Sequence, residues 1–156
     1  MRRKDREITD FKQIMEIIDR CDCCRVGFCD EGQVYIVPLN FGYTEENGKL
    51  TFYFHGAKEG RKIDLIGKAP KVGFEMDTNH KLNEGESACD YSYRFQSVIG
   101  NGKISVIEDL EEKKQALNLV MKHVTGKDAW EYQENMLKVV AAFKLEVEEL
   151  SCKEHA

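Results

Sequence analysis

The chain has 156 residues, of which 23 are Lys or Arg and 28 are Asp or Glu, so its formal net charge is −5. This length fits one domain, because two domains of half the size would each bury too little surface to be stable. A hydrophobic share of 42% excludes a largely disordered chain. The acidic balance argues against nucleic acid as a partner, since phosphate backbones are bound by positive surfaces. We expect one domain over residues 1–150 and a C-terminal tail over residues 151–156.

The sequence contains no segment that resembles a membrane span or a signal peptide. No stretch approaches the roughly 20 apolar residues that a membrane-spanning helix needs. The basic N-terminus over residues 1–6 is not followed by an apolar segment. We therefore expect a cytoplasmic protein without a membrane partner.

Six cysteines are too few for a disulfide framework in a chain of this length. Cys21, Cys23 and Cys24 form a cluster with C-x-x-C spacing, which raises zinc or redox chemistry as one interpretation. No second cysteine pair or histidine pair completes a tetrahedral zinc site. We expect reduced, half-buried thiols and no metal.

The first half of the chain reads as a helix followed by three strands. Asp10 is a good N-cap, and apolar residues at helical spacing then predict a helix that ends near Arg20. A strand over residues 23–28 is followed by residues 34–41, whose nearly continuous apolar run predicts a strand buried on both faces. Asn47-Gly48 is a strong hairpin signal. The third strand is expected over residues 50–55.

The second half alternates helices with longer strands. Asp109 and Gly126 have the residue types of an N-cap and a C′ position, and they frame the clearest amphipathic helix of the chain. Residues 77–90 are polar and are expected to form a loop. The other expected elements are helices over residues 58–67 and 128–138 and strands over residues 72–76, 91–107 and 143–148.

This order predicts a mainly β fold with flanking helices, of the α+β class. Six strands in hairpin-like succession favour a six-stranded antiparallel barrel, closed or split, with the helices packed outside. Alternating βαβ units and a G-x-G-x-x-G motif are both absent from the sequence. A dinucleotide-binding Rossmann fold is therefore disfavoured.

The segment over residues 54–62 has the features of a phosphate site. A strand ends, Gly56 allows close approach of the backbone, and a helix begins near Lys58, Arg61 and Lys62. Cations at a helix N-terminus oppose the helix dipole, but a bound phosphate would reverse the sign of that interaction. The alternative is a charged helix whose Lys and Arg side chains face water.

Two further segments could contact a ligand. Pro38 cannot donate to a strand ladder, so residues 35–41 form either an edge strand or a strand along which a planar ligand lies, with the Asn40 amide available. His55 is a candidate catalytic residue, although a lone His is more often a hydrogen-bonded structural residue. Gln96 and Ser97 could supply polar contacts from the long strand.

Four segments together resemble the pyridoxamine 5′-phosphate oxidase-like flavoproteins, and most closely their 5-nitroimidazole resistance (Nim-type) branch. These segments are V-P-L-N-F at 37–41, F-H-G-A at 54–57, G-R-K-I-D-L at 60–65 and S-V-I-G-x-G-K at 97–103. The G-R-K-I-D-L block is the most specific of them. The resemblance extends in order and spacing from about Asp10 to Leu150.

The resemblance implies a six-stranded split barrel that binds FMN at a homodimer interface. It implies that Arg61 and Lys62 grip the phosphate, and that the strand around Val37 lies along the isoalloxazine ring. Asn101 stands where relatives often carry a bulky residue, which concerns the substrate side of the site. The complete set of implied cofactor-binding residues is Val37, Pro38, Leu39, Asn40, His55, Gly56, Arg61, Lys62, Gln96 and Ser97.

The function that this resemblance implies is that of an FMN-dependent oxidoreductase, with FAD as the alternative cofactor. Its substrates would be small molecules such as nitroimidazoles, reduced by electrons from the flavin. His55 is the candidate for substrate contact or proton donation. Two alternatives stay open: a non-catalytic flavin-binding redox sensor or carrier, and a split barrel that binds haem or another small molecule.

Overall fold

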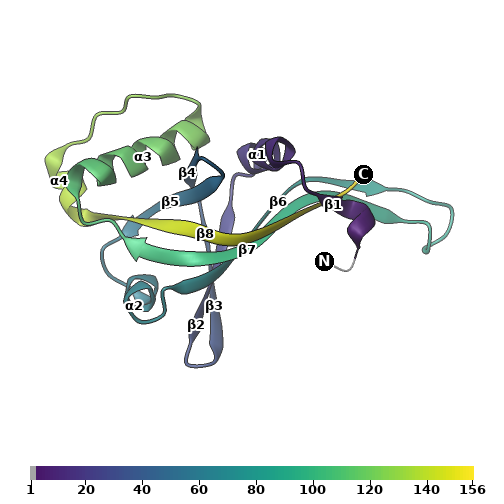
Figure 1. The fold of residues 1–156 in the computed structure, drawn as a ribbon, viewed down its shortest axis with the longest axis horizontal. Coiled ribbons are helices and arrows are strands. Elements are labelled where there is room, and N and C mark those ends of the chain that lie inside the picture. Colours follow the sequence, from purple (N-terminus) through teal and green to yellow (C-terminus); the bar gives the residue numbers. More distant parts are fainter. Residues whose placement is uncertain (1–2) are drawn as a thin grey trace.

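The computed structural model describes residues 3–156 and shows one antiparallel sheet that curls into a barrel (Figure 1). The strands lie in the order β3-β2-β6-β7-β8-β5-β4, and β1 adds to β8. The fold class is the mainly β architecture expected, with eight described strands rather than six. The strands are β1 (Glu7–Ile8), β2 (Cys24–Asp30), β3 (Gln33–Leu39), β4 (Gly42–Glu46), β5 (Lys49–Ala57), β6 (Lys71–Asn83), β7 (Ser92–Val106) and β8 (Val140–His155).

The helices begin and end at residues whose side chains or backbone favour those positions. Asp10 accepts a hydrogen bond from the Gln13 amide, and Asp109 accepts one from the Glu112 amide, as N-caps do. Gly126 adopts a left-handed conformation with φ of 72° at the C-cap. The helices are η1 (Lys4–Arg6), α1 (Phe11–Arg20), α2 (Arg61–Lys68), α3 (Leu110–Thr125) and α4 (Glu134–Val139).

The core lies on the inner face of the curled sheet. Helix α1 contributes three isoleucines to it, and the strands contribute most of the large side chains. Aromatic rings on β5 contact rings on other elements: Phe52 packs edge-on against Phe41 and against Phe74. Burial of this apolar surface is the main force that closes the sheet. The largest fully buried aromatic residues are Phe28, Phe41, Phe52, Phe54 and Phe143.

The prediction that residues 34–41 are buried on both faces is wrong. Strand β3 pairs only with β2 and stands at the end of the sheet order, so its second edge is free. Val34 is 73% exposed and Ile36 is 60% exposed. The apolar run of the sequence therefore reflects one face packed on the core and one face open at the surface.

The chain forms more strand than its local composition predicts. Strand β6 extends to Asn83 through residues expected as a loop, because it pairs with β7 far beyond the barrel. Residues 151–155, expected as a tail, continue β8 and pair with β7, and Cys152 is buried there. Pairing with β7 thus stabilises both segments as strands, although their residues are mostly polar.

Two helices are shorter than predicted. Helix α2 begins at Arg61 rather than at Lys58, because Gly60 precedes it with φ of 121°, which is outside the helical region. Helix α4 begins at Glu134, six residues later than predicted, and ends at Val139, one residue beyond the predicted end. Within residues 3–156, no helix is both long enough and apolar enough to span a membrane.

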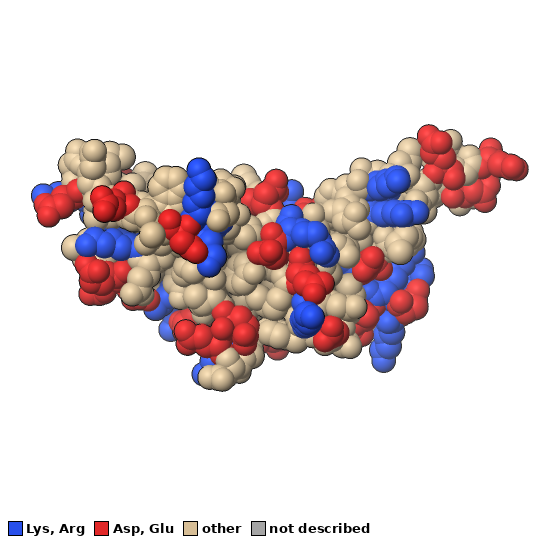
Figure 2. Space-filling view, turned by 90° about the horizontal axis from the view of Figure 1, so that it is seen from above, with Lys and Arg blue, Asp and Glu red and all other residues tan. Residues whose placement is uncertain are grey.

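The β6–β7 hairpin forms an arm that projects beyond the barrel on the side where the termini lie (Figure 1). Past Phe95 the arm has two strands only, since β8 ends opposite that residue. Viewed from above, acidic side chains gather at the tip of the arm (Figure 2); they include Glu84, Glu86 and Asp90.

All six cysteines are free thiols in the structure. Burial raises the pKa of Cys21 to about 12 and that of Cys152 to about 11, so both thiols stay protonated at neutral pH. Burial also raises the pKa of Cys24. In the part of the chain that the structure describes, no group of His, Cys, Asp and Glu side chains gathers as a metal site.

Candidate functional site

The junction between β5 and α2 forms an open helix N-terminus. Strand β5 ends at Ala57 and α2 begins at Arg61 after Gly60. No side chain caps this helix, so its first backbone N–H groups are not used by a capping residue. Such groups, together with the positive end of the helix dipole, favour a bound anion.

Lys62 adds a cation directly beside this junction. Its Nζ lies so close to Gly56 that a Cβ at Gly56 would stand 2.6 Å from it. The same Nζ lies 5.7 Å from the centre of the Phe143 ring. Within residues 3–156 the ammonium group makes no ion pair. We refer to His55, Gly56, Arg61 and Lys62 as the α2 cradle.

Arg61 points to a different part of the molecule. Its guanidinium donates hydrogen bonds to Asp30 at the end of β2, with an Nη2–Oδ2 distance of 2.9 Å. It also lies 4.5 Å above the ring of Tyr35 on β3. The Arg61 side chain is half exposed, so this ion pair contributes little to stability and can open at small cost.

His55 lies opposite Ala142 on β8 and is exposed at the surface. Neighbouring groups crowd its ring, and this partial loss of hydration lowers the pKa of His55 below 6.5. The positive charge of Lys62 lowers it further. The imidazole is therefore neutral at pH 7.

The remaining predicted polar residues lie at the opposite end of the barrel. Asn40 donates from its amide to the carbonyl of Asp22, at 3.0 Å. Gln96 accepts a hydrogen bond from Arg20 on α1, also at 3.0 Å. Ser97 is buried, and its hydroxyl has no hydrogen-bond partner in the described residues. A buried hydroxyl without a partner costs about 1–3 kcal/mol.

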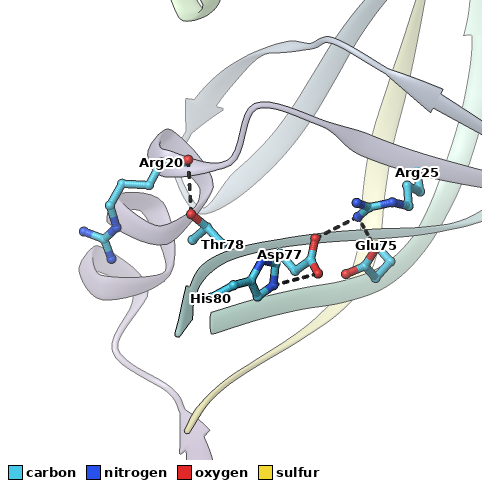
Figure 3. A network of polar contacts seen from close by, with 6 residues as sticks. All are labelled: Arg20, Arg25, Glu75, Asp77, Thr78 and His80. Atoms are coloured by element: carbon cyan, nitrogen blue, oxygen red, sulfur yellow. Dashed lines mark hydrogen bonds and ion pairs between the residues drawn. The ribbon is translucent and has the colours of Figure 1, made fainter. Parts of the chain in front are cut away.

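A polar network joins β2 to β6 (Figure 3), and β6 pairs with β7, the strand that carries Ser97. Arg25 donates to Glu75 at 2.9 Å and to Asp77 at 2.8 Å, and His80 lies 3.0 Å from Asp77. Asp77 is the cross-strand neighbour of Ser97. These contacts fasten β2 to β6, but none of them satisfies the serine hydroxyl.

The structure thus places the predicted site residues in two groups, which lie at opposite ends of the barrel and do not meet within one chain. His55 opposes Ala142 and Ser97 opposes Lys153, so the groups are eleven residues apart on β8, roughly 35 Å of strand. Strand β3 runs between them, with its Tyr35 end near Arg61. Three residues of β3 are predicted to bind the cofactor. Of these, Val37 is partly buried, Leu39 is buried and Pro38 is exposed.

Sequence reasoning missed Asp30 and Tyr35, which hold Arg61. The sequence patterns give Asp30 no role in a site, and they place Tyr35 only within the strand predicted over residues 35–41. Both contacts join residues more than 25 positions apart, so no local spacing could have indicated them.

Comparisons with known proteins identify the fold and the family of the chain. The family model described as pyridoxamine 5′-phosphate oxidase matches residues 10–154. A solved structure of a candidate 5-nitroimidazole antibiotic resistance protein from Bacteroides thetaiotaomicron is 37% identical, with a TM-score of 0.82. The alignment covers 95% of this chain and 86% of that one. A comparison with curated proteins finds no significant match.

Two more distant structures share the fold. The flavocytochrome Anf3 from Azotobacter vinelandii is 20% identical with a TM-score of 0.81, covering all of this chain and 72% of its own. The FAD and haem binding protein from Mycobacterium smegmatis is 17% identical with a TM-score of 0.80, covering 96% and 73%. At these identities the likeness concerns the fold alone.

The sheet topology and these matches define the class of the protein as a mainly β, antiparallel split barrel. The chain belongs to the pyridoxamine 5′-phosphate oxidase family. The α2 cradle fits the phosphate of an FMN group on its own geometry. The missing Cβ at Gly56 lets the Lys62 ammonium lie over the strand end, where it makes no ion pair within residues 3–156. With the uncapped helix N-terminus it supplies positive charge for an anion.

Proposed function

We propose that this protein is a flavin-dependent oxidoreductase that reduces small molecules, with nitroimidazole-like compounds as the candidate substrates. The observation that carries the proposal is the α2 cradle, where an unpaired lysine and an uncapped helix N-terminus meet at Gly56. Support for the substrate class comes from the Bacteroides relative, at 37% identity. Support for a flavin comes from the family match and from the names of the two more distant neighbours, a flavocytochrome and an FAD and haem binding protein.

The residues of the chain would position the cofactor rather than perform the electron transfer. A bound flavin accepts and passes on electrons, which no side chain of the cradle can do. Lys62 and the first amides of α2 would hold the phosphate of the FMN unit, whether FMN itself or the FMN half of FAD. Arg61 would join them by leaving Asp30, since that ion pair is exposed and weak.

His55 would act on the substrate side of the phosphate. Its lowered pKa keeps the imidazole neutral at pH 7, so the ring can accept a hydrogen bond or a proton. Residue type alone leaves both substrate contact and proton donation open for His55, and the lowered pKa favours substrate contact. A donor would need the protonated ring, which Lys62 disfavours.

We further propose that two copies of the chain form the working unit. The edge strand β3 exposes Val34 and Ile36 beside Pro38, and apolar side chains along an unpaired edge are suited to burial by another molecule. One chain also leaves Asn40, Gln96 and Ser97 far from the cradle along the sheet. A symmetric dimer is the simplest arrangement that covers the edge and completes a cleft.

The test is the absorbance spectrum of the purified protein, followed by anaerobic titration. A flavin spectrum is expected, as are bleaching by a nicotinamide nucleotide or dithionite and recovery on addition of a 5-nitroimidazole. A colourless protein that takes up no added flavin would refute the proposal. A haem spectrum in place of a flavin spectrum would favour a haem-binding barrel.

A flavin-binding sensor or carrier without turnover is the second candidate. It predicts the same spectrum and the same bleaching. It differs in the last step, because nitro compounds would then reoxidise the bound flavin no faster than they reoxidise free reduced flavin. Product analysis for reduced nitroimidazole separates the two.

A further inference from the structure

The arm formed by β6 and β7 carries apolar side chains that lie open at the surface. Leu82 and Tyr93 are cross-strand partners on the arm, and they are 49% and 52% exposed. Tyr91, at the base of the tip, is exposed to a similar degree. Past Phe95 the arm is a ribbon of two strands, and such a ribbon is only marginally stable in water on its own. A surface that covers these side chains would therefore stabilise the arm.

The apolar face of the arm continues into the face by which two chains are proposed to meet. Alternate residues of a strand lie on the same side of a sheet, so Tyr93 shares a face of β7 with the exposed Ile99. The register carries this face from Ile99 across β6 and β2 to Pro38 on β3. Ile36, two residues before Pro38, lies on the same side. A second copy packed on this outer face is thus continuous with the arm.

The symmetry of a dimer determines where the arm of one chain meets the other. If the Ser97 end of one barrel lies at the α2 cradle of its partner, the facing strands run in opposite directions. The arm begins at Phe95, two residues from Ser97, and residues 91–95 carry it roughly 13 Å outward before the tip. It then passes the α2 cradle of the second copy in the direction of α4, which directly precedes β8.

The surface at α4 offers both apolar and positively charged groups. Met136 and Val139 on this short helix are 53% and 59% exposed, and Leu110 at the start of α3 is half exposed. Lys58 and Lys138 are also exposed. In the part of the chain that the structure describes, neither of these two lysines makes an ion pair.

The tip of the arm carries the opposite charge. Asp90 accepts hydrogen bonds from the amide and the hydroxyl of Ser87, so its carboxylate is used within the tip. Glu84 and Glu86 are exposed there, and they take part in no ion pair within residues 3–156. The arm and the α4 surface therefore match in two respects, apolar area and charge.

We propose that the arm of each chain lies across α4 of the second copy, with Leu82 and Tyr93 on the apolar side chains there and Glu86 beside Lys138. This inference rests on the two-chain unit of the proposed function. The arm would cover a cavity of about 770 Å³ between α2, α3 and α4. Ala141 lines this cavity and is the cross-strand partner of Gly56 in the α2 cradle. Each copy would thus close the site of the other.

The test is zero-length cross-linking with a carbodiimide, which joins a lysine to a carboxylate in contact with it. Dimers are assembled from equal parts of isotope-labelled and unlabelled full-length chains. Cross-links between residues 84–90 and Lys138 are expected, and they should join labelled to unlabelled peptides. One chain cannot form this bond with itself, because its tip and its α4 lie at opposite ends of the molecule (Figure 1).

Glu86→Lys should weaken the dimer about tenfold, measured by sedimentation equilibrium, because the substitution removes an ion pair twice in a symmetric dimer. Lys138→Glu should weaken it similarly, and the two substitutions combined should restore the affinity. Glu46→Lys is the matched control. It makes the same charge change at an exposed position on β4, at the other end of the sheet order from β3, and should leave the dimer unaltered.

A dimer whose tip forms no cross-link to α4 of the other chain would overturn this inference and leave the two-chain proposal intact. Cross-links from the tip to a different surface would overturn it as well, and so would equal dimer affinities for Glu86→Lys and Glu46→Lys. A monomeric protein would refute the two-chain proposal and this inference with it. Flavin binding by such a monomer would leave the flavin function standing.

Discussion

Arg61 and Lys62 are adjacent in the sequence, yet their charged groups contact different strands. Lys62 lies over the end of β5 and has no anionic partner in the described chain, whereas Arg61 is held by Asp30 and Tyr35. A phosphate at the cradle therefore meets Lys62 first, and it must compete with a carboxylate for Arg61. The two residues are expected to differ in their importance for binding.

Lys62→Ala should weaken flavin binding about tenfold to a hundredfold, because it removes a charge-assisted hydrogen bond at the phosphate. Equilibrium dialysis of the flavin measures this. Lys68→Ala, in the last turn of the same helix, is the control and should bind flavin normally. Unchanged flavin affinity in Lys62→Ala would contradict the phosphate assignment.

His55 should titrate below the ordinary histidine value of 6.5 in the folded protein. Lys62→Met should raise the pKa of His55 only part of the way back, because burial is the larger cause of the shift. Between the folded and unfolded pKa values the unfolded chain holds more protons, so this residue makes unfolding easier as the pH falls below about 6.5. NMR titration of the ring protons tests the prediction, and a pKa at or above 6.5 would contradict it.

At the scale of elements, α3 lies unusually close to β4. A Cβ on Gly42 would stand 2.3 Å from the backbone carbon of Leu119 in α3. The helix thus rests directly on the strand, and Ala116 and Leu117 on that helix are buried. Only glycine permits this distance, so Gly42 sets the packing of α3 on β4.

Gly42→Ala should lower the free energy of unfolding by about 1–3 kcal/mol, the usual cost of overpacking where backbone must move. Thermal unfolding followed by circular dichroism measures the loss. Gly67→Ala is the control, since a Cβ there meets open space within a helix and should be neutral or stabilising. A melting temperature for Gly42→Ala equal to that of the unmodified protein would show that α3 can shift freely.

The elements also show which kinds of structure the sequence can predict. The limits of α3 were predictable, because Asp109 and Gly126 act on backbone groups within one turn. The open face of β3 and the long β6 were not, because they depend on which strands lie beside them. The same distinction holds for the candidate site. The G-R-K block is a local motif that the sequence shows directly, whereas the contact between Arg61 and Asp30 depends on the fold.

At the scale of the whole molecule, the two-chain proposal depends on the outer edge of the barrel. Val34 and Ile36 stand on the exposed face of β3, and Gly27 on β2 opposes Ile36 without a side chain. Because Gly27 has no side chain, the surface beside Val34 and Ile36 is recessed. A second barrel could therefore pack closely against this face.

The protein should elute with about twice the 18.0 kDa mass of its chain. Ile36→Glu should shift it to the single-chain mass and weaken flavin binding at the same time, because a charge cannot be buried at the interface without a partner. Light scattering coupled to size exclusion measures the mass. Val124→Glu, at a similarly exposed position on α3, should remain a dimer. A monomeric unmodified protein would refute the two-chain proposal.

Strand β8 has a consequence for how the chain folds as it is synthesised. It is the last strand of the sheet in chain order, yet it lies between β5 and β7 and carries the buried residues Phe143, Leu145 and Cys152. Until residues 140–155 leave the ribosome, both neighbouring strands have open edges, and the barrel cannot close. Nascent chains stalled at residue 139 should therefore be digested rapidly by protease, whereas chains that expose β8 fully should resist it.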